Sequence, residues 1–167
     1  MARTVILGAG IASHAAALHL RRLVGKAHDV VVVAPNSKWN WIPSNVWVGV
    51  GQMTVKQVTF PLGPIYARKG IEFHQALATE LHAEGSADLP RPHVTVRYTD
   101  PAREGQIGTL EYDYLINATG PKLNFGATPG LGPVWPHLVG LHRRTCDGDR
   151  EGLRGGHREP QSRQAAL

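Results

Sequence analysis

Six residues near the start of the chain have the types and the spacing of a phosphate-binding turn. The stretch GAGIAS, Gly8 to Ser13, follows a short apolar run and precedes a series of helix formers. In that setting the first glycine permits a tight turn, and Gly10 lets the backbone approach a pyrophosphate at the free N–H groups of a helix N-terminus. Ser13 replaces the usual third glycine and is still small enough for close helix-to-strand packing. The motif predicts a dinucleotide site.

A dinucleotide site of this kind usually has an acidic residue about 20 positions further on, which binds the ribose hydroxyls. Asp29 has that spacing, but it precedes four valines and therefore lies at the wrong end of the second strand. We expect Asp29 to be a solvated turn residue. Asn36 follows the correct end and can accept a hydroxyl hydrogen bond without a charge, which predicts weaker ribose recognition.

Other chemistry-bearing side chains are few. Cys146 is the single cysteine, and nearby Arg143 and Arg144 would favour its thiolate, but it lies in a stretch without a fold signal. One cysteine makes no internal disulfide or multi-thiolate metal site, which favours a cytoplasmic location. The nine histidines show no i, i+4 pair beside an acid, so no metal site is expected. His14 is expected to be a packed or surface residue, and no residue is assigned as catalytic.

The elements that would position the motif form a βαβ unit. Residues 4–10 are typical of a buried parallel strand that ends in glycines. Residues 11–24 predict a helix that ends at Gly25, with Ala12, Ala16, Leu20 and Leu23 on one side. Residues 28–35 predict a second strand, and the connection must be right-handed.

The next hundred residues predict the rest of the sheet. Residues 36–51 hold Trp39, Trp41 and Trp47 and are too irregular for a helix, so we expect an ordered loop whose tryptophans either pack against it or cover a flat ring. A short helix follows Pro61 and ends at Gly70. A third strand and extended segment from Ile71, a strand at 93–98 and a strand pair within 107–120 predict a small antiparallel insertion before the last core strand.

Composition excludes several classes of protein. The net charge of +5 could favour anionic partners, but no aromatic residues interleave the arginines of residues 134–167, so nucleic-acid binding is not expected. Gly8, Gly10 and Ser13 interrupt the apolar opening, which argues against a secretory signal. No stretch approaches the ~20 apolar residues of a membrane span. Residues 134–167 lack periodicity and predict a disordered tail.

Read in order, the glycine motif, WNWIPSNVWVGVG, FPLGPIYARKGIEF and YDYLINATGPKLNF resemble the sulfide:quinone oxidoreductases, flavoproteins with two dinucleotide-binding domains. The most specific parts are Pro43-Ser44-Asn45 and the segment from Ala118 to Lys122. The resemblance covers roughly residues 3–133. It implies an α/β fold, in which a Rossmann-like βαβ parallel sheet carries a small antiparallel insertion. Residues 1–133 would then form an incomplete FAD/NAD(P)-binding domain.

The resemblance also implies the cofactor, its contacts and its partners. FAD would lie along Gly8, Gly10 and Ser13, with its adenosine near Asn36 and Ala78. The flavin would be flanked by the loop Pro43-Ser44-Asn45 and by the turn Thr119-Gly120. In this family, sulfide sulfur is carried by two cysteines and electrons pass to a membrane quinone. Those cysteines, the central domain and the membrane-binding part lie in later segments. We therefore expect weak or no FAD retention, no turnover, and peripheral contact with the inner face of a membrane only if the later segments were present.

After Pro133 the family pattern continues with a run similar to Ser-Val-Cys-Thr that ends in His-Ala and places its cysteine near the flavin. The codons of Trp135–Cys146, read one nucleotide later, permit Gly-His-Thr-Ser-Ser-Val-Cys-Thr-Val-Glu-His-Ala. Leu141-His142 encoded as CTG-CAC would then yield the Cys-Thr pair. We hypothesise a frameshift near Val134, which makes residues 134–167 an out-of-frame tail and Cys146 an accident of the reading frame.

Two other interpretations fit the sequence. A related NADH:quinone-type pyridine nucleotide oxidoreductase would share the glycine motif, although the Pro43-Ser44-Asn45 loop argues for the sulfide branch. A non-enzymatic nucleotide-binding module with a basic tail would bind RNA or anionic vesicles in a salt-sensitive way.

Overall fold

The computed structural model of the chain describes residues 1–121, 124 and 127. These residues fall into two compact units, one of residues 1–40 and 59–121 and the other of residues 41–58 with 124 and 127. The predicted domain boundary at 133 and the predicted tail, Cys146 included, lie outside the described residues.

A six-stranded sheet forms the centre of the first unit, in the order β7-β6-β5-β2-β1-β8. Its strands are β1 (Arg3–Leu7), β2 (Asp29–Ala34), β5 (Glu72–His82), β6 (His93–Tyr98), β7 (Ile107–Glu111) and β8 (Tyr114–Asn117). The strands β5, β2, β1 and β8 run parallel, and β6 and β7 continue the sheet in antiparallel fashion. The predicted α/β class with a parallel sheet and an antiparallel insertion is confirmed.

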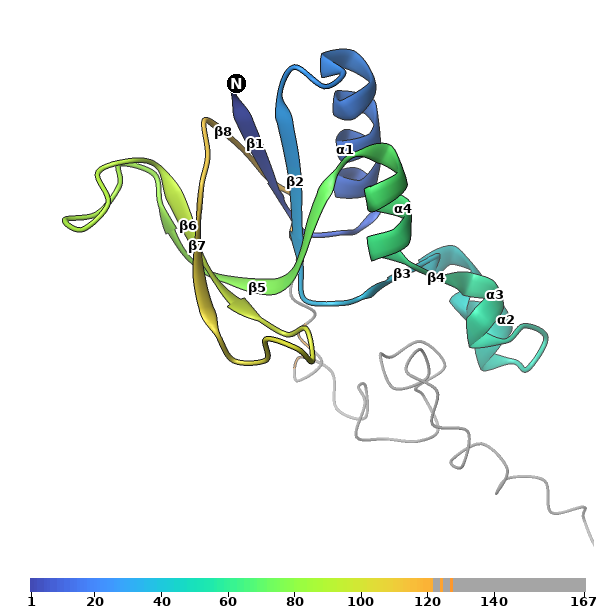
Figure 1. The fold of residues 1–167 in the computed structure, drawn as a ribbon. Helices are drawn as coiled ribbons and strands as arrows, with labels where there is room; N and C mark the ends of the chain where they lie inside the picture. Colours follow the sequence, from blue (N-terminus) through green and yellow to red (C-terminus); the bar gives the residue numbers. More distant parts are fainter. Residues whose placement is uncertain (122–123, 125–126, 128–167) are drawn as a thin grey trace, which may run out of the picture. The chain divides into compact units, whose positions relative to one another are not determined.

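Two helices, α1 (Ile11–Val24) and α4 (Leu62–Lys69), cover one face of the parallel strands (Figure 1). Apolar side chains from both strands and helices meet there, among them Ile6, Val30, Val32, Leu62 and Tyr66. Both helices end before a glycine, Gly25 and Gly70, whose φ angles are positive. The sequence predicted that both helices end at these glycines. A residue with a Cβ is strained in this conformation, which favours glycine at the end of a helix.

The buried face of α1 agrees with the predicted one in part. Ser13 and Ala17 are the buried residues of this helix, and Ala16 and Leu20 pack against the apolar cluster beneath it. Ala12 is exposed and Leu23 is 69% exposed, so the predicted side is right at two of its four residues.

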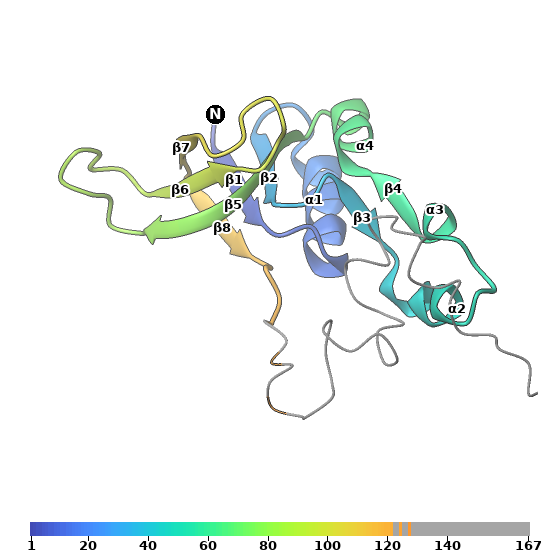
Figure 2. The ribbon, with the colours of Figure 1, turned by 90° about the horizontal axis from the view of Figure 1, so that it is seen from below.

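The other face of the parallel strands is covered by the antiparallel insertion. β5 pairs with β2 through its first residues, up to Gln75, and then with β6 from Ala76 onward, with a register shift between Ala78 and Glu80. Figure 2 shows β5, β6 and β7 on the side of β1 and β2 away from α1. Their apolar side chains pack on Val5, Leu7, Val31 and Val33, so the valine-rich strands are buried on both faces, as parallel sheets require.

The segment predicted as a loop over residues 36–51 is more regular than expected. It contains a short strand, β3 (Lys38–Asn40), which pairs with β4 (Thr59–Pro61), and in the second unit a 3₁₀ turn, η1 (Ile42–Ser44), followed by α2 (Asn45–Gly49). The second unit also holds α3 (Val55–Val58), and the amide of Trp41 donates to the carbonyl of Val58 at 2.8 Å. The prediction that no helix forms in 36–51 was wrong, because Pro43 begins a helical turn rather than ending one.

Candidate functional site

The carboxyl ends of the parallel strands form one level edge. Leu7 at the end of β1 pairs with Val33 on one side and with Asn117 on the other. The chain proceeds from β1 to β2 and β5 on one side and returns to β8 on the opposite side. The strand order thus reverses at β1, and open α/β sheets bind ligands outside the carboxyl ends of strands at such a switch point.

The chain turns at Gly8, immediately after β1. Glycine is required at this position because two backbone segments approach each other closely. Its φ angle is +104°, and its amide donates to the carbonyl of Val33 at 2.7 Å. A Cβ atom at this position would overlap the carbonyl oxygen of Ala118 and lie 2.8 Å from the carbonyl carbon. The first glycine of the motif therefore packs the β1 turn against the turn that follows β8.

Gly10 lies in the opposite situation, because a Cβ atom there would meet nothing within 4 Å. It caps α1, and the His14 amide donates to the Gly10 carbonyl at 3.0 Å. The N–H groups of residues 11–13 consequently have no partner within the helix. No side chain caps this helix end and no acidic residue lies in its first turn. The space beside Gly10 is thus open, and the field there favours an anion.

Ser13 fills the place of the third glycine. Its side chain is fully buried, and its hydroxyl donates to the Gly10 carbonyl at 3.2 Å. The predicted role of Ser13 in close packing agrees with this burial. The hydroxyl is satisfied within the turn, so Ser13 supports the turn rather than offering a further donor.

Thr119 and Gly120 lie beyond β8 at the same edge as Gly8. The Asn117 carboxamide oxygen accepts hydrogen bonds from the Thr119 amide at 3.3 Å and from the Thr119 hydroxyl at 2.9 Å. Gly120 has a φ angle of +75°, and both Thr119 and Gly120 are exposed. The side chain of Asn117 therefore holds this turn in shape while its backbone faces outward.

Asn36 follows β2 and is exposed on a turn that a neighbouring strand fixes in place. The Thr99 hydroxyl donates to the Pro35 carbonyl at 2.8 Å, and the Thr99 amide donates to the carbonyl of Gln75 at 3.0 Å. Thr99 thus connects the end of β2 to β5. Asp29 lies opposite Arg3 in the register of β1 and β2, at the start of both strands. The prediction that Asp29 lies at the edge away from Asn36 is therefore correct.

The remaining predicted contacts lie elsewhere in the chain. Ala78 is on β5, three residues beyond Gln75, where its half-buried side chain packs on the apolar core. Pro43, Ser44 and Asn45 belong to the second unit, in which Asn45 is buried.

The three tryptophans of this region belong to two different units. Trp39 is buried and stacks on Phe60 with ring centroids 4.8 Å apart, in the first unit. Trp41 and Trp47 belong to the second unit and are 44% and 48% exposed. Trp39 therefore follows the packing interpretation.

His14 makes contacts that no local sequence pattern predicts. Its Nδ1 lies 3.1 Å from the hydroxyl of Tyr66 on α4, and its ring is surrounded by Trp39, Phe60 and Tyr66. Burial lowers the pKa of His14 below its ordinary value and raises the pKa of the fully buried Tyr66 to about 12. These partners are more than 20 residues away along the chain, and no local pattern connects them to the first helix.

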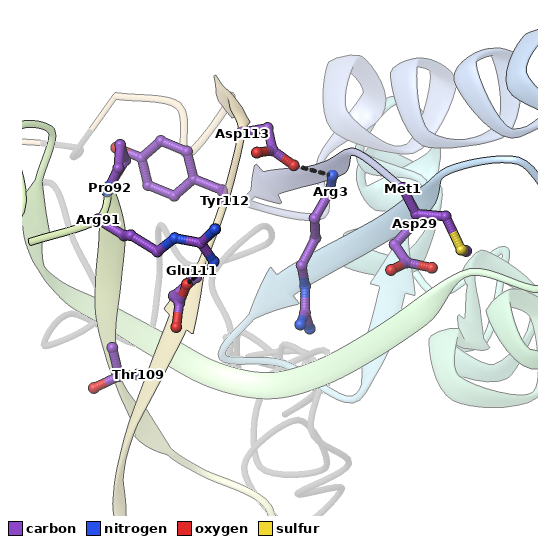
Figure 3. Close-up of a pocket in the computed structure, with 9 residues that line it drawn as sticks. All are labelled: Met1, Arg3, Asp29, Arg91, Pro92, Thr109, Glu111, Tyr112 and Asp113. Carbon is purple, nitrogen blue, oxygen red and sulfur yellow. Dashed lines mark hydrogen bonds and ion pairs between the residues drawn. The ribbon is translucent and has the colours of Figure 1, made fainter. Parts of the chain in front are cut away.

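A hollow of about 450 Å³ lies at the opposite, amino edge of the parallel strands. Arg3 and Asp29 line it on one side, and Arg91 and Glu111 on the other (Figure 3). The Arg3 guanidinium pairs with Glu72 at 3.0 Å, and that of Arg91 pairs with Glu111 at 3.0 Å. Because both arginines are paired with acids of the chain itself, the hollow offers a phosphate little net attraction, and it does not coincide with the glycine motif.

Within residues 1–121, 124 and 127, no helix has the length and apolar character needed to cross a membrane. In the same part of the chain, no group of three or more histidine, cysteine, aspartate or glutamate side chains is arranged to hold a metal ion.

Comparison with known proteins gives relatives but no family profile that matches the chain. It is 27% identical over 123 residues to a sulfide-quinone reductase of Aquifex aeolicus, a match that covers 74% of this chain and 25% of the relative. It is 28% identical over 154 residues to a probable ferredoxin reductase of Castellaniella defragrans, covering 91% of this chain and 33% of that one. The chain thus spans about a quarter to a third of the length of these relatives.

A solved structure supports the same resemblance. The sulfide:quinone oxidoreductase of Aquifex aeolicus superposes with a TM-score of 0.61 at 26% identity, over 75% of this chain and 26% of that chain. The resemblance to the sulfide:quinone oxidoreductases that the sequence indicates is confirmed. The chain is similar, in sequence and in fold, to a part of oxidoreductases that bind dinucleotides through a Rossmann-like domain.

Proposed function

We propose that the carboxyl edge of the parallel sheet binds FAD and that the chain supplies the FAD-binding part of a sulfide:quinone oxidoreductase. In such a protein electrons from sulfide pass through FAD to a quinone. One observation carries the proposal, namely the contrast between Gly8, which is packed against Ala118, and Gly10, beside which the space is open. The similarity to a sulfide-quinone reductase supports the choice of branch.

The residues at this edge fit the pyrophosphate and the adenosine. The N–H groups of residues 11–13 would donate to phosphate oxygens, since no cap and no acid of the first turn compete for them. Asn36 would accept from a ribose hydroxyl, without the charge of the more usual acid. The exposed backbone of Thr119 and Gly120 would border the ligand on the β8 side. Bound FAD would supply a two-electron acceptor, which no side chain of the described residues provides.

The flavin contacts are part of the same proposal. We propose that Pro43, Ser44 and Asn45 flank the ring system and that the β5 strand near Ala78 borders the adenosine. The resemblance in sequence supports these roles. No residue of the chain is assigned as catalytic, so sulfide oxidation and quinone reduction would require polypeptide beyond that described.

The reading-frame hypothesis stays a prediction. The hypothesis concerns residues outside the described part of the chain. The sequence match to the ferredoxin reductase covers 91% of the chain, so this match extends beyond Val134. Sequencing the coding DNA decides the question, because a frameshift requires a flavoprotein-like continuation with a Cys-Thr pair in the neighbouring frame.

Binding of three nucleotides to the purified chain tests the proposed site. ADP carries the pyrophosphate and adenosine, FMN carries the flavin without them, and FAD carries both. We expect FAD and ADP to bind with dissociation constants of about 10 μM to 1 mM and FMN to bind more weakly. Gly10→Ala should abolish the difference between ADP and FMN. The matched control is Gly63→Ala in α4, where the added methyl group likewise meets nothing within 4 Å.

Three results would count against the proposal. Equal binding of FMN and ADP would show that the adenosine half is not recognised. Retention of ADP by Gly10→Ala would move the site away from the helix terminus. A purified chain that is bright yellow and reduces quinone with sulfide would contradict the proposal that it supplies only part of the enzyme.

A pyridine nucleotide-dependent reductase is the second candidate function. The 28% identity to a probable ferredoxin reductase over 91% of the chain favours it. NADH binding with an affinity at least equal to that of FAD, and lost in Gly10→Ala, would support this candidate over the first.

A further inference from the structure

His14 is the first side chain after the free N–H groups of α1 that can change its charge. Its own amide makes the first hydrogen bond of the helix, to the Gly10 carbonyl at 3.0 Å. The imidazole is therefore attached within one turn of the proposed phosphate position. A phosphate within one helical turn of a partly buried imidazole interacts with the charge of that imidazole.

Among the described residues, the ring of His14 contacts three aromatic side chains. The ring contacts are with Trp39 of β3, Phe60 of β4 and Tyr66 of α4. Of these only Tyr66 titrates, and its pKa of about 12 keeps the hydroxyl protonated at neutral pH. That hydroxyl can donate to Nδ1 of the neutral imidazole, which leaves the proton of His14 on Nε2.

Two features of the fold disfavour a positive charge on His14 in the absence of ligand. The aromatic side chains remove water from the ring, and burial lowers the pKa of His14. The positive end of the α1 dipole lies within the same turn, and no acid of that turn offsets it. A phosphate at the N-terminus of α1 would reverse the effect of the helix dipole on His14, because the negative charge of the phosphate opposes the positive end of the dipole.

We infer that His14 is a proton-linked positioning residue for the phosphate-bearing ligand of the glycine turn: occupation of the α1 N-terminus promotes protonation of His14, and acidification strengthens binding. The inference rests on the proposed function, since it requires an anion at that helix terminus. Linkage makes the coupling reciprocal, so the ligand must raise the proton affinity of His14 by the factor by which protonation raises ligand affinity.

Two measurements with ADP as the probe test this role. NMR titration of the imidazole resonances gives the pKa of His14 with and without saturating ADP, and exposed His19 on the same helix serves as the internal control. Calorimetry gives ADP affinity between pH 5.5 and 8. We expect ADP to raise the pKa of His14 but not that of His19. Affinity should rise about fivefold on acidification beyond the change that titration of ADP itself causes.

The variants separate this role from packing. His14→Gln retains a polar partner for Tyr66 but does not titrate, so its pH profile for ADP should lose the His14 component, while His19→Gln keeps it. ADP that shifts the amides of residues 11–13 while the pKa of His14 stays constant would overturn the inference alone. ADP that leaves those amides unchanged would overturn the proposed site and the inference with it. The NMR titration uses the unmodified chain, so a variant that fails to fold does not prevent the test.

Discussion

The two edges of the parallel sheet differ in how their polar groups are satisfied. At the amino edge, Arg3 and Arg91 face a hollow of about 450 Å³, and each forms an ion pair with an acid of the chain. At the carboxyl edge, the polar groups are backbone amides at the start of α1, with neither a cap nor an acid in the first turn. The amino edge has a hollow whose two arginines form ion pairs, whereas the carboxyl edge presents helix N–H groups that no side chain of the described residues caps.

The proposed site rests on donor balance rather than on volume. An arginine already paired with glutamate contributes little net attraction for a phosphate, since the acid repels what the base attracts. An uncapped helix N-terminus combines several N–H donors with a fixed partial charge.

Gly8→Ala should produce the largest change. The new methyl group would overlap the Ala118 carbonyl, and the φ angle of +104° is strained for any residue with a Cβ. We expect the free energy of unfolding to fall by roughly 3 kcal/mol or more. Urea denaturation followed by circular dichroism measures it. A loss below about 1 kcal/mol would mean that the two turns are not packed as described.

Gly10→Ala should affect binding rather than folding. Its methyl group would enter open space, so unfolding should change by no more than about 1 kcal/mol. ADP affinity should fall about tenfold or more, which corresponds to at least 1.4 kcal/mol of binding free energy. Calorimetry beside the Gly8 variant gives the contrast, and a stable Gly10 variant with unchanged ADP affinity would contradict it.

Thr99→Val tests the connection that holds the turn before Asn36. It removes the hydroxyl donor to the Pro35 carbonyl and keeps the volume of the side chain. We expect a loss of about 1 kcal/mol in unfolding free energy and a smaller loss of ADP affinity than Gly10→Ala causes. Thr109→Val at the amino edge is the matched control. Equal effects of the two threonine variants on ADP binding would remove the distinction between the edges.

The pH dependence of stability reports on His14. Its pKa is lowered by burial, so the folded chain binds fewer protons than the unfolded chain below pH 6.5. Stability is therefore fully present above the ordinary pKa and decreases as the pH falls through the lowered value. Urea unfolding at several pH values should show this decrease, and His14→Gln should reduce it. An unchanged profile in the variant would exclude His14 as its source.

Arg91→Ala should have the smallest effect. Its side chain is 76% exposed and its partner Glu111 is 43% exposed, and surface pairs of this kind contribute about 0–1 kcal/mol. ADP affinity should stay within about twofold of the unmodified chain. A large loss of ADP binding in this variant would transfer the ligand site to the amino edge.

The sequence predicted the parallel sheet and the glycine turn because both depend on local patterns. Valine runs, a strand-glycine-helix order and glycine stops at Gly25 and Gly70 are visible in the residues themselves. It failed where contacts between distant residues decide the outcome. Ala12 and Leu23 of α1 share the helical spacing of Ala16 and Leu20 but are exposed, and the 3₁₀ turn and α2 form in a stretch with no helical periodicity.

The site shows the same division. The spacing of Gly8, Gly10 and Ser13 and the position of Asn36 after a strand indicate these residues as candidates for the proposed site. The roles of Ala118 as the neighbour of Gly8, of Thr99 and of the His14–Tyr66 pair were not found. Each of these depends on a partner brought close only by the fold, and a single sequence carries no signal for it.

An NMR titration of the labelled chain with FAD, which follows the backbone amides of both edges, locates the ligand. If FAD binds at the carboxyl edge, we expect shifts at residues 10–13, 36 and 119–120 and constant resonances at Arg3, Arg91 and Glu111. Shifts confined to the amino edge, or no shift at the carboxyl edge with about 1 mM FAD, would contradict the proposed site.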